Sequence, residues 1–323
     1  MSDTIVHFRE LNKILENVFK KEKVLVSDYL FHYQYGVIDL ESNTFYLDIH
    51  EHIDLDSFKV SRHEYPSIYD VRDALLISQS IEFGGLKKLI DFISIYMDIT
   101  EGAPLALGLD TNIVLNGLLN PFREIVEKTT WKGSLLVVVP SIVYQEINRL
   151  YLEEYSRTEA RRLGNKDIEG LQKKIARLSI AGLMNLTKLR EVVQVKKFGA
   201  PVSPTDFTSS EAGKYFNDFM VREQIRQYAQ NTGTPTLHIS ADKDSVMMAR
   251  AEGTPSVLIE IPKLTKKEYL INLDDFIYSL AILRGMVLIK SENNKNFVLI
   301  KTIWPDKSRE DWFSNLIKLK LNI

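Results

Sequence analysis

The sequence predicts an α/β protein: a mostly parallel sheet flanked by helices, with α+β regions before and after it. Two continuous apolar runs, 105–109 and 135–139, are typical of strands that are buried on both faces. Segments with helical periodicity follow these runs, and two further strand-like runs occupy 235–240 and 256–261. Because strands and helices alternate, the connections favour a parallel sheet with helices on both faces.

Length and composition are those of an ordinary globular protein. The chain has 323 residues, of which 45% are hydrophobic and 26% are charged. Cysteine is absent, which excludes disulfides and thiolate chemistry. No apolar run is long enough to cross a bilayer, and the start Met1-Ser2-Asp3 is unlike a signal peptide. We therefore expect a cytoplasmic protein without a membrane partner.

The chain is expected to contain three parts. Residues 1–104 form an acidic α+β region that ends at Gly102-Ala103-Pro104. Residues 105–261 form the core domain, which includes a basic helical insertion at 155–198. Residues 262–323 form a small α+β extension. The elements expected outside the core are helices at 6–19, 67–81, 85–97, 273–283 and 309–319, and strands at 24–37, 44–53, 286–290 and 297–304.

Charge is distributed unevenly along the chain, although the net charge is only −2. Residues 1–104 carry 10 Lys and Arg against 18 Asp and Glu, whereas residues 157–197 carry 11 against 4. Such asymmetry indicates that one region binds a polyanion and another does not.

Four acidic residues occur at corresponding places in the α/β pattern. Asp110 ends the first strand, Glu146 lies in the helix after the second, Asp218 lies early in a later helix, and Asp242 ends the strand 235–240. Strand ends and the helix turns after them converge on one edge of a parallel sheet. Carboxylates gathered there need a cation, and hard oxygen ligands favour Mg²⁺ or Mn²⁺. Such a metal site can hydrolyse phosphodiesters.

Each acid also has a local explanation. Asp110 and Asp242 suit helix N-caps, and Glu146 suits an exposed helical position. Asp218 suits the first turn of a helix, where a negative charge interacts favourably with the helix dipole. The metal-site hypothesis therefore depends on the four acids occurring together in this order.

The motifs around these acids resemble those of PIN-domain nucleases. Asp110-Thr111-Asn112 is similar to the opening motif of that family, and residues 240–253 are similar to its closing motif. Residues 139–147 and 217–222 resemble the segments that carry the second and third acids. The resemblance covers 105–261 and implies a PIN-like sheet.

In such a site, Asp110, Glu146, Asp218 and Asp242 would bind Mg²⁺ or Mn²⁺ and activate water to cleave single-stranded or structured RNA. By the same resemblance, Asn112 and Ser240 would orient the acids, and Asp244 would be an additional ligand.

The basic insertion supports RNA as the partner. The residues expected to contact phosphates are Arg157, Arg161, Arg162, Lys173, Lys174 and Arg177. The alternative is a solvated helical hairpin whose leucines pack inward. The sequence leaves homodimer formation open.

Two other functions are consistent with the same residues. The first is an RNA-binding scaffold that keeps a PIN-like fold without cleaving. The second is a metal-dependent DNA nuclease of the related flap-nuclease type. Processing, decay or ribosome maturation fits the additional regions by analogy only.

Overall fold

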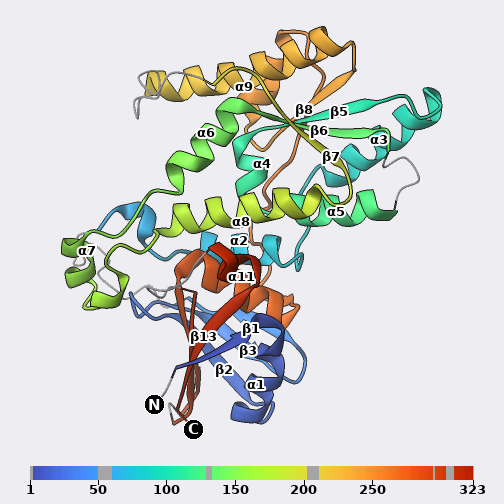
Figure 1. Cartoon of the computed structure of the whole chain (residues 1–323). Helices are drawn as coiled ribbons and strands as arrows, with labels where there is room; N and C mark the ends of the chain where they lie inside the picture. Colours follow the sequence, from blue (N-terminus) through green and yellow to red (C-terminus); the bar gives the residue numbers. More distant parts are fainter. Residues whose placement is uncertain are drawn as a thin grey trace. The chain divides into compact units, whose positions relative to one another are not determined.

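The parallel sheet expected from the alternating elements is present in the computed structural model, which describes residues 3–49, 60–128, 133–201, 211–293, 295–302 and 309–322. The chain divides into two units (Figure 1). Unit 1 contains residues 1–81, 151–181 and 263–323, and unit 2 contains residues 82–150 and 182–262. This division differs from the three consecutive segments expected from sequence, because unit 1 is assembled from three separate stretches.

Unit 2 is built on a five-stranded parallel sheet with the order β7-β6-β5-β8-β9. Its strands are β5 (Leu105–Leu109), β6 (Leu135–Pro140), β7 (Gln194–Phe198), β8 (Thr236–Ser240) and β9 (Ser256–Leu258). Its helices are α3 (Leu86–Ile99), α4 (Thr111–Leu115), α5 (Leu119–Lys128), α6 (Ser141–Leu150), α9 (Glu211–Thr232) and α10 (Lys243–Ala251). Helix α8 (Lys174–Leu189) begins in unit 1 and ends in unit 2.

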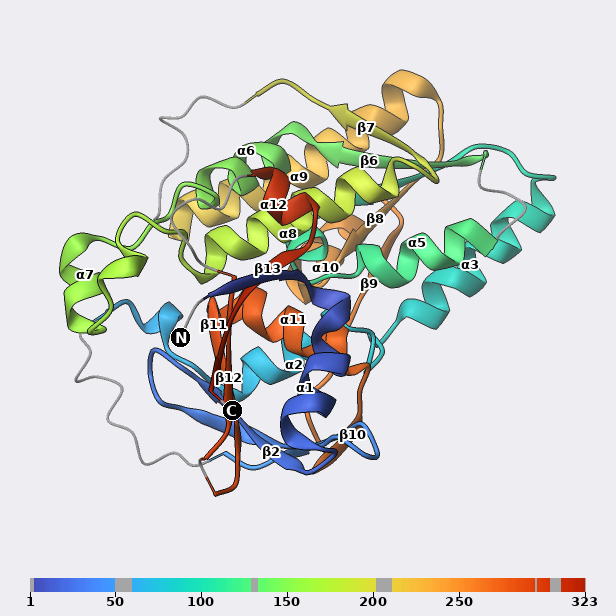
Figure 2. The same cartoon turned by 60° about the horizontal axis from the view of Figure 1, so that its bottom comes forward.

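Helix α9 packs across β6, β7 and β8. Its Tyr228 lies in a buried cluster with Ala106 and Val138. The helix approaches β5 closely at Gly108, where an added Cβ would lie 2.7 Å from the side chain of Ile225. Glycine is therefore required in β5 so that α9 can approach the sheet. On the outside of the unit, α3 and α5 lie next to each other in both ribbon views (Figures 1 and 2).

Unit 1 contains an eight-stranded antiparallel sheet with the order β1-β13-β12-β11-β2-β3-β4-β10. Its strands are β1 (Thr4–His7), β2 (Lys23–Asp28), β3 (Gln34–Asp39), β4 (Thr44–Leu47), β10 (Glu268–Leu270), β11 (Met286–Ser291), β12 (Phe297–Lys301) and β13 (Leu316–Asn322). Its helical segments are η1 (Phe8–Glu10), α1 (Leu11–Phe19), η3 (Arg62–Glu64), α2 (Ile68–Ile77), α7 (Arg157–Arg162), η4 (Lys166–Ile168), α11 (Leu273–Arg284) and α12 (Arg309–Phe313).

Buried charges connect the three stretches of unit 1. The Arg284 guanidinium lies 2.7 Å from Asp28 and 3.6 Å from Asp70, and all three side chains are buried. Lys174, from the middle stretch, forms an ion pair with Asp70. Burial alone would raise the pKa of Asp70, but Arg284 and Lys174 hold that pKa below its ordinary value. Tyr155 donates a 2.6 Å hydrogen bond to Glu64. The middle stretch is therefore part of the core of unit 1.

Three sequence-based expectations differ from this fold. The helix expected at 309–319 is wrong beyond Phe313, because 316–322 forms β13, which pairs with β1 and β12. The single strand expected at 24–37 is two strands, β2 and β3. The basic insertion is not wholly helical, because β7 is the edge strand of the parallel sheet. The Pro, Ser and Thr residues of 200–210 predict a loop, but this segment lies mostly outside the described residues.

No helix in the described part of the chain is both long enough and apolar enough to cross a membrane.

Candidate functional site

Asp110 lies directly after β5 and is almost fully buried, with 5% of its surface exposed. Its Oδ1 accepts a 2.7 Å hydrogen bond from the Thr111 backbone, as in a helix N-cap. Its Oδ2 accepts hydrogen bonds from Ser240 Oγ at 2.6 Å and from Asn112 Nδ2 at 3.1 Å. Asn112 Oδ1 in turn accepts a bond from the Ala241 backbone. The ends of β5 and β8 are thus joined through polar groups that hold this carboxylate in place.

Burial and acidic neighbours raise the pKa of Asp110. Burial raises the pKa of Asp110 to about 6, although the hydrogen bonds from Ser240 and Thr111 act to lower this pKa. The charges of Asp218 and Glu146 raise the pKa further. No Lys or Arg among the described residues forms an ion pair with Asp110. Glu146 and Asp218 therefore each repel Asp110 electrostatically, and no basic side chain among the described residues offsets this repulsion by an ion pair with Asp110.

Glu146 and Asp218 come from helices α6 and α9, which contact each other. Both side chains are half-buried. Glu146 Oε2 accepts a 2.6 Å hydrogen bond from Thr111 Oγ1, which directs it toward the start of α4. Gln224 positions α6 relative to α9, because its Oε1 accepts a hydrogen bond from the Ile142 backbone and its Nε2 donates one to Ala200.

Asp242 serves as the N-cap of α10. Its Oδ1 accepts hydrogen bonds from the backbones of Asp244 at 2.8 Å and Ser245 at 3.3 Å. Its own N–H donates to Ser240 Oγ, so Asp242 is connected to Asp110 through that hydroxyl. The Asp244 side chain is exposed in the first turn of the helix. Asp242 therefore has the cap role that its sequence position suggests, whereas Asp244 contributes only its backbone N–H to the described hydrogen bonds with the other acids.

The chemistry of these side chains fits Mg²⁺ or Mn²⁺ because every donor is a hard oxygen. A divalent cation would also relieve the repulsion that raises the pKa of Asp110. Among the described residues, however, no three His, Asp or Glu side chains are close enough to form a ready metal-binding group. Glu146 is hydrogen-bonded to Thr111 and Asp242 to its own helix, so both would have to turn to share an ion with Asp110.

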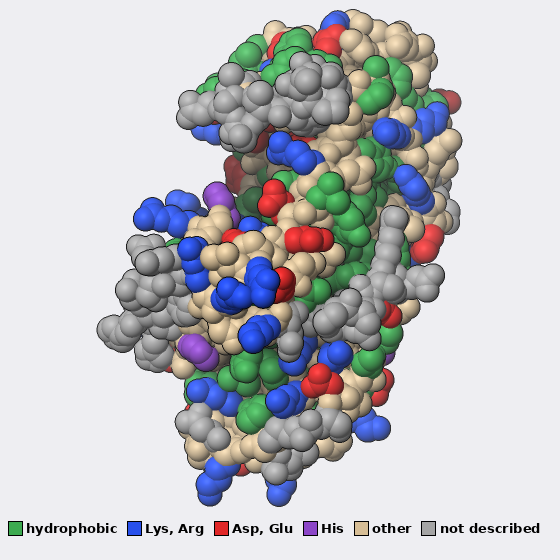
Figure 3. Space-filling view, turned by 60° about the vertical axis from the view of Figure 1, so that its left-hand side comes forward, with side chains coloured by type: hydrophobic (Ala, Val, Ile, Leu, Met, Phe, Trp, Pro, Cys, Tyr) green, Lys and Arg blue, Asp and Glu red, His purple; other side chains and the backbone are tan. Residues whose placement is uncertain are grey.

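The six basic residues expected to contact RNA fall into two groups. Arg177 is buried and donates to the carbonyls of Ile282 and Leu283, so it is not accessible to phosphate. Lys173 is paired with Glu159 at 3.0 Å, and Lys174 is paired with Asp70. The prediction is therefore wrong for Arg177, whereas Lys173 and Lys174 are half-buried and engaged in ion pairs within unit 1. The exposed members are Arg157, Arg161 and Arg162. Figure 3 shows Lys and Arg side chains gathered over this α7 region.

The sequence interpretation did not identify the aromatic residues beside Asp218. On α9, Tyr215 is 75% exposed, Phe219 is 46% exposed and Phe216 is 37% exposed. Position 215 neighbours both 218 and 219 on one side of the helix. The sequence shows three aromatic residues close to Asp218. It does not show that they are exposed, because that depends on which side of α9 packs against the sheet.

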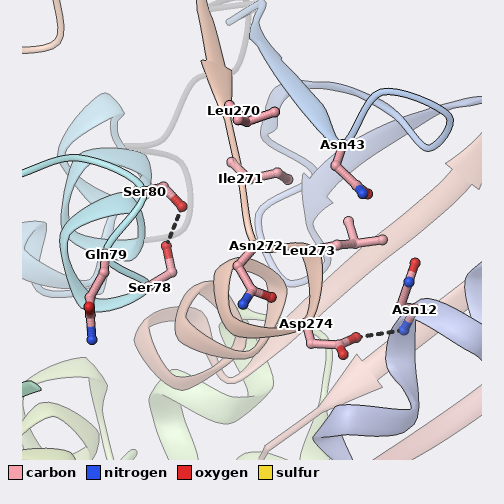
Figure 4. A pocket seen from close by; sticks show the side chains of 10 residues that line it. All are labelled: Asn12, Asn43, Ser78, Gln79, Ser80, Leu270, Ile271, Asn272, Leu273 and Asp274. Carbon is pink, nitrogen blue, oxygen red and sulfur yellow. Dashed lines mark hydrogen bonds between the residues drawn. The ribbon is translucent and has the colours of Figure 1, made fainter. Parts of the chain in front are cut away.

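Unit 1 has a polar pocket of about 510 Å³ that contains none of the acids discussed above. Figure 4 shows its lining: Asn12, Asn43, Ser78, Gln79, Ser80, Leu270, Ile271, Asn272, Leu273 and Asp274. Its carboxylate, Asp274, accepts a 2.6 Å hydrogen bond from the Asn12 backbone. The two residues join the starts of α1 and α11, so these polar groups have a structural role.

Comparisons with known proteins identify no family. No protein-family model matches the chain, and no curated protein matches it. Among solved structures, the chain is similar to a domain of a functionally unknown protein from Methanocaldococcus jannaschii DSM 2661. The two are 17% identical, the match covers 51% of this chain and 96% of that one, and the TM-score is 0.34. A similarity this weak carries no argument about function.

Proposed function

We propose that unit 2 is a Mg²⁺- or Mn²⁺-dependent nuclease that hydrolyses RNA phosphodiesters. The observation that supports this most strongly is the state of Asp110: a buried carboxylate at the carboxyl end of β5, with its pKa raised to about 6 and with Asp218 and Glu146 contributing to that shift. A buried acid with acidic neighbours costs stability, and such costs are concentrated at functional sites. The resemblance of the motifs around the four acids to PIN-domain nucleases supports the same proposal.

The residues in this site would have distinct roles. Asp110, Glu146 and Asp218 would hold the metal ion, and Asp242 would join them by turning from its cap. When bound, the ion supplies an activated water and positive charge beside the scissile phosphate. Asn112 and Ser240 keep Asp110 in one orientation through their hydrogen bonds to Oδ2. Thr111, which follows Asp110 in the chain, donates a hydrogen bond to Glu146 and would orient that carboxylate for the ion.

Exposed aromatic rings favour a nucleic acid with unpaired bases as the substrate. Tyr215, three residues before Asp218, lies on the same side of α9 as Asp218, and Phe219 lies one turn after Tyr215; both rings are exposed. Bases of a single strand stack on such rings, whereas bases within a duplex are already stacked. The rings do not distinguish RNA from DNA, so the choice of RNA depends on the family resemblance.

The test is cleavage of labelled single-stranded RNA, single-stranded DNA and duplexes in Mn²⁺, Mg²⁺ or EDTA. Asp110→Asn and Asp242→Asn are compared with the wild type and with Glu191→Gln, which removes an exposed acid whose side chain is 64% accessible. We expect cleavage of single-stranded RNA that requires metal, is lost in Asp110→Asn and Asp242→Asn, and is unchanged in Glu191→Gln.

The other outcomes point elsewhere. Cleavage that survives both substitutions comes from a contaminating nuclease. Cleavage of DNA alone assigns the site to a DNA nuclease. Tight, salt-sensitive RNA binding without cleavage in any metal supports a scaffold instead.

A further inference from the structure

Helix α3 carries a stripe of large apolar residues on its outer face. Phe92 is 39% exposed, Ile95 is 59% exposed and Ile99 is 77% exposed. The spacing of three and then four residues places them on one side of the helix, as in the seam of a coiled coil. The other side of the helix is buried at Leu86, Leu89, Ile93 and Met97. A helix that is apolar on both faces usually has a second partner.

A groove borders this stripe. Its volume is about 460 Å³, and its walls include Phe92 and Tyr96 of α3 together with Arg226, Ala229 and Gln230 of α9. The rings of Phe92 and Tyr96 are stacked, with centroids 6.5 Å apart. The groove also includes the first residues of β5 and β8, Leu105 and Thr236, whereas the acids follow the last residues of these strands. A partner bound here would leave the acidic edge of the sheet open.

The charges along α3 have opposite signs at its two ends. Lys87 and Lys88 are exposed in the first turn, and Asp98 and Glu101 are exposed at and just after the last turn. None of these four side chains forms an ion pair within the described part of the chain. The helix dipole adds positive potential at the lysine end and negative potential at the acidic end.

We propose that this surface binds the same surface of a second copy of the chain, with the two α3 helices antiparallel. In this arrangement Phe92 meets the partner's Ile99, and Ile95 lies close to the two-fold axis. The lysines of each helix come within reach of the acids of the other, whereas a parallel pair would bring like charges together. A surface that is complementary to itself in this way forms a closed, isologous dimer.

One residue opposes the pairing. Asp91 lies on the flank of the stripe, near the position of the partner's Asp98, and is exposed. This repulsion and the short length of α3, 14 residues, limit the interface. We expect a dissociation constant on the order of micromolar, at the weak end for a specific interface. The proposal does not depend on the nuclease function.

Sedimentation velocity of the full-length protein, from submicromolar to about 100 μM, tests the dimer. We expect Ile95→Asp to weaken dimerisation by about 100-fold, because it places two charges at the centre of the interface. The matched control is Met247→Asp on α10, where the replaced side chain is 57% exposed but lies outside the stripe. This control should leave dimerisation unchanged. Circular dichroism melting should show that both variants remain folded, since both positions are on the surface.

Exchanging the charges tests the antiparallel arrangement. Lys88→Glu and Asp98→Lys should each weaken the dimer by about fivefold. The double variant Lys88→Glu/Asp98→Lys restores opposite charges across an antiparallel pair and should return to the wild-type value. Asp91→Asn should tighten the dimer.

Three results would overturn the proposal. One is a monomer at every concentration, and another is a dimer that Ile95→Asp does not weaken. The third is a double variant that dimerises no better than Lys88→Glu and Asp98→Lys alone.

Discussion

Asp110 shows how one residue can satisfy two interpretations. Its sequence position suits a helix N-cap, and the structure gives it that role through the Thr111 backbone. The same carboxylate is buried, accepts two side-chain hydrogen bonds and has acidic neighbours. A cap needs only the first of these features, because solvent can serve the second oxygen. The remaining features are those of a site that holds a charge in place.

Removing this charge should therefore stabilise the protein when no metal is present. A pKa raised to about 6 means that the folded state holds the proton more tightly than the unfolded state. The unfavourable effect on stability develops as pH rises from 3.8 to about 6 and is complete at pH 7.5. In EDTA at pH 7.5, Asp110→Asn should raise the free energy of unfolding by about 1–2 kcal/mol. The full shift corresponds to about 3 kcal/mol, but the amide cannot accept all the hydrogen bonds of the carboxylate.

Urea denaturation with and without Mn²⁺ measures this effect. Mn²⁺ should stabilise the wild type and leave Asp110→Asn unchanged. A variant that is less stable than the wild type in EDTA would show that the cap and its hydrogen bonds outweigh the buried charge.

His238 should make stability fall in mild acid. It lies on β8, is fully buried, and neither ring nitrogen has a hydrogen-bond partner among the described residues. Burial lowers the pKa of His238 to about 4, and Arg222 contributes. As pH falls below 6.5, His238 becomes protonated in the unfolded chain, whereas in the folded chain it stays neutral until about pH 4. The wild type should thus lose about 2 kcal/mol between pH 7 and pH 5 from this residue.

The measurement is urea denaturation at several pH values, with His238→Leu as the comparison. The variant keeps a buried apolar side chain and should lose less stability over this range. An identical pH dependence in both proteins would contradict the assignment to His238.

At the scale of elements, the sequence predicted the strands whose position depends on a local residue pattern. The apolar runs of β5 and β6 are continuous and were identifiable as buried strands, and the strand expected at 44–53 contains β4. Strand β7 was missed because it is an edge strand, whose Lys196 and Lys197 look like part of a basic helix. Strand β13 was missed because its register is set by pairing with β1, more than 300 residues earlier in the chain.

The basic segment shows the same limit. Nothing local distinguishes Arg177, which is buried, from Arg161, which is exposed. The difference arises from α11, whose last carbonyls accept hydrogen bonds from Arg177. Charge counting along the chain therefore overestimated how many of these basic side chains are accessible.

Arg284 should be the most sensitive charged residue of unit 1. Replacing it with methionine leaves Asp28 and Asp70 buried without their guanidinium partner. We expect Arg284→Met to lower the free energy of unfolding by about 3–5 kcal/mol. The control is Arg72→Met, which removes a partly exposed pair with Asp73 and should cost about 1 kcal/mol or less. Similar losses in the two variants would show that the buried network contributes little.

At the scale of the whole molecule, the linear order of charge does not correspond to the folded units. The acidic segment up to residue 81 and the basic segment 151–181 belong to the same unit. Residues 82–104, which appeared to belong to the acidic region, belong with the parallel sheet. Sequence reasoning places boundaries where composition changes, whereas the chain passes between the units four times. Deleting residues 1–104 would therefore remove parts of both units.

Truncated proteins whose boundaries follow the two units give a more informative test of which segments fold together. In the first protein, residues 82–150 are joined to 182–262 by a flexible Gly/Ser linker of roughly 15 residues. It keeps every strand of the parallel sheet, the close packing of α9 on Gly108, and α3 with its buried face. The second protein is 105–261, which lacks α3 and keeps Arg177 without its carbonyl acceptors on α11. We expect the first to unfold cooperatively in circular dichroism melts and the second to melt without a transition or to aggregate. If 105–261 folds as well as the joined protein, α3 is dispensable and the core is the smaller domain that the sequence motifs mark out.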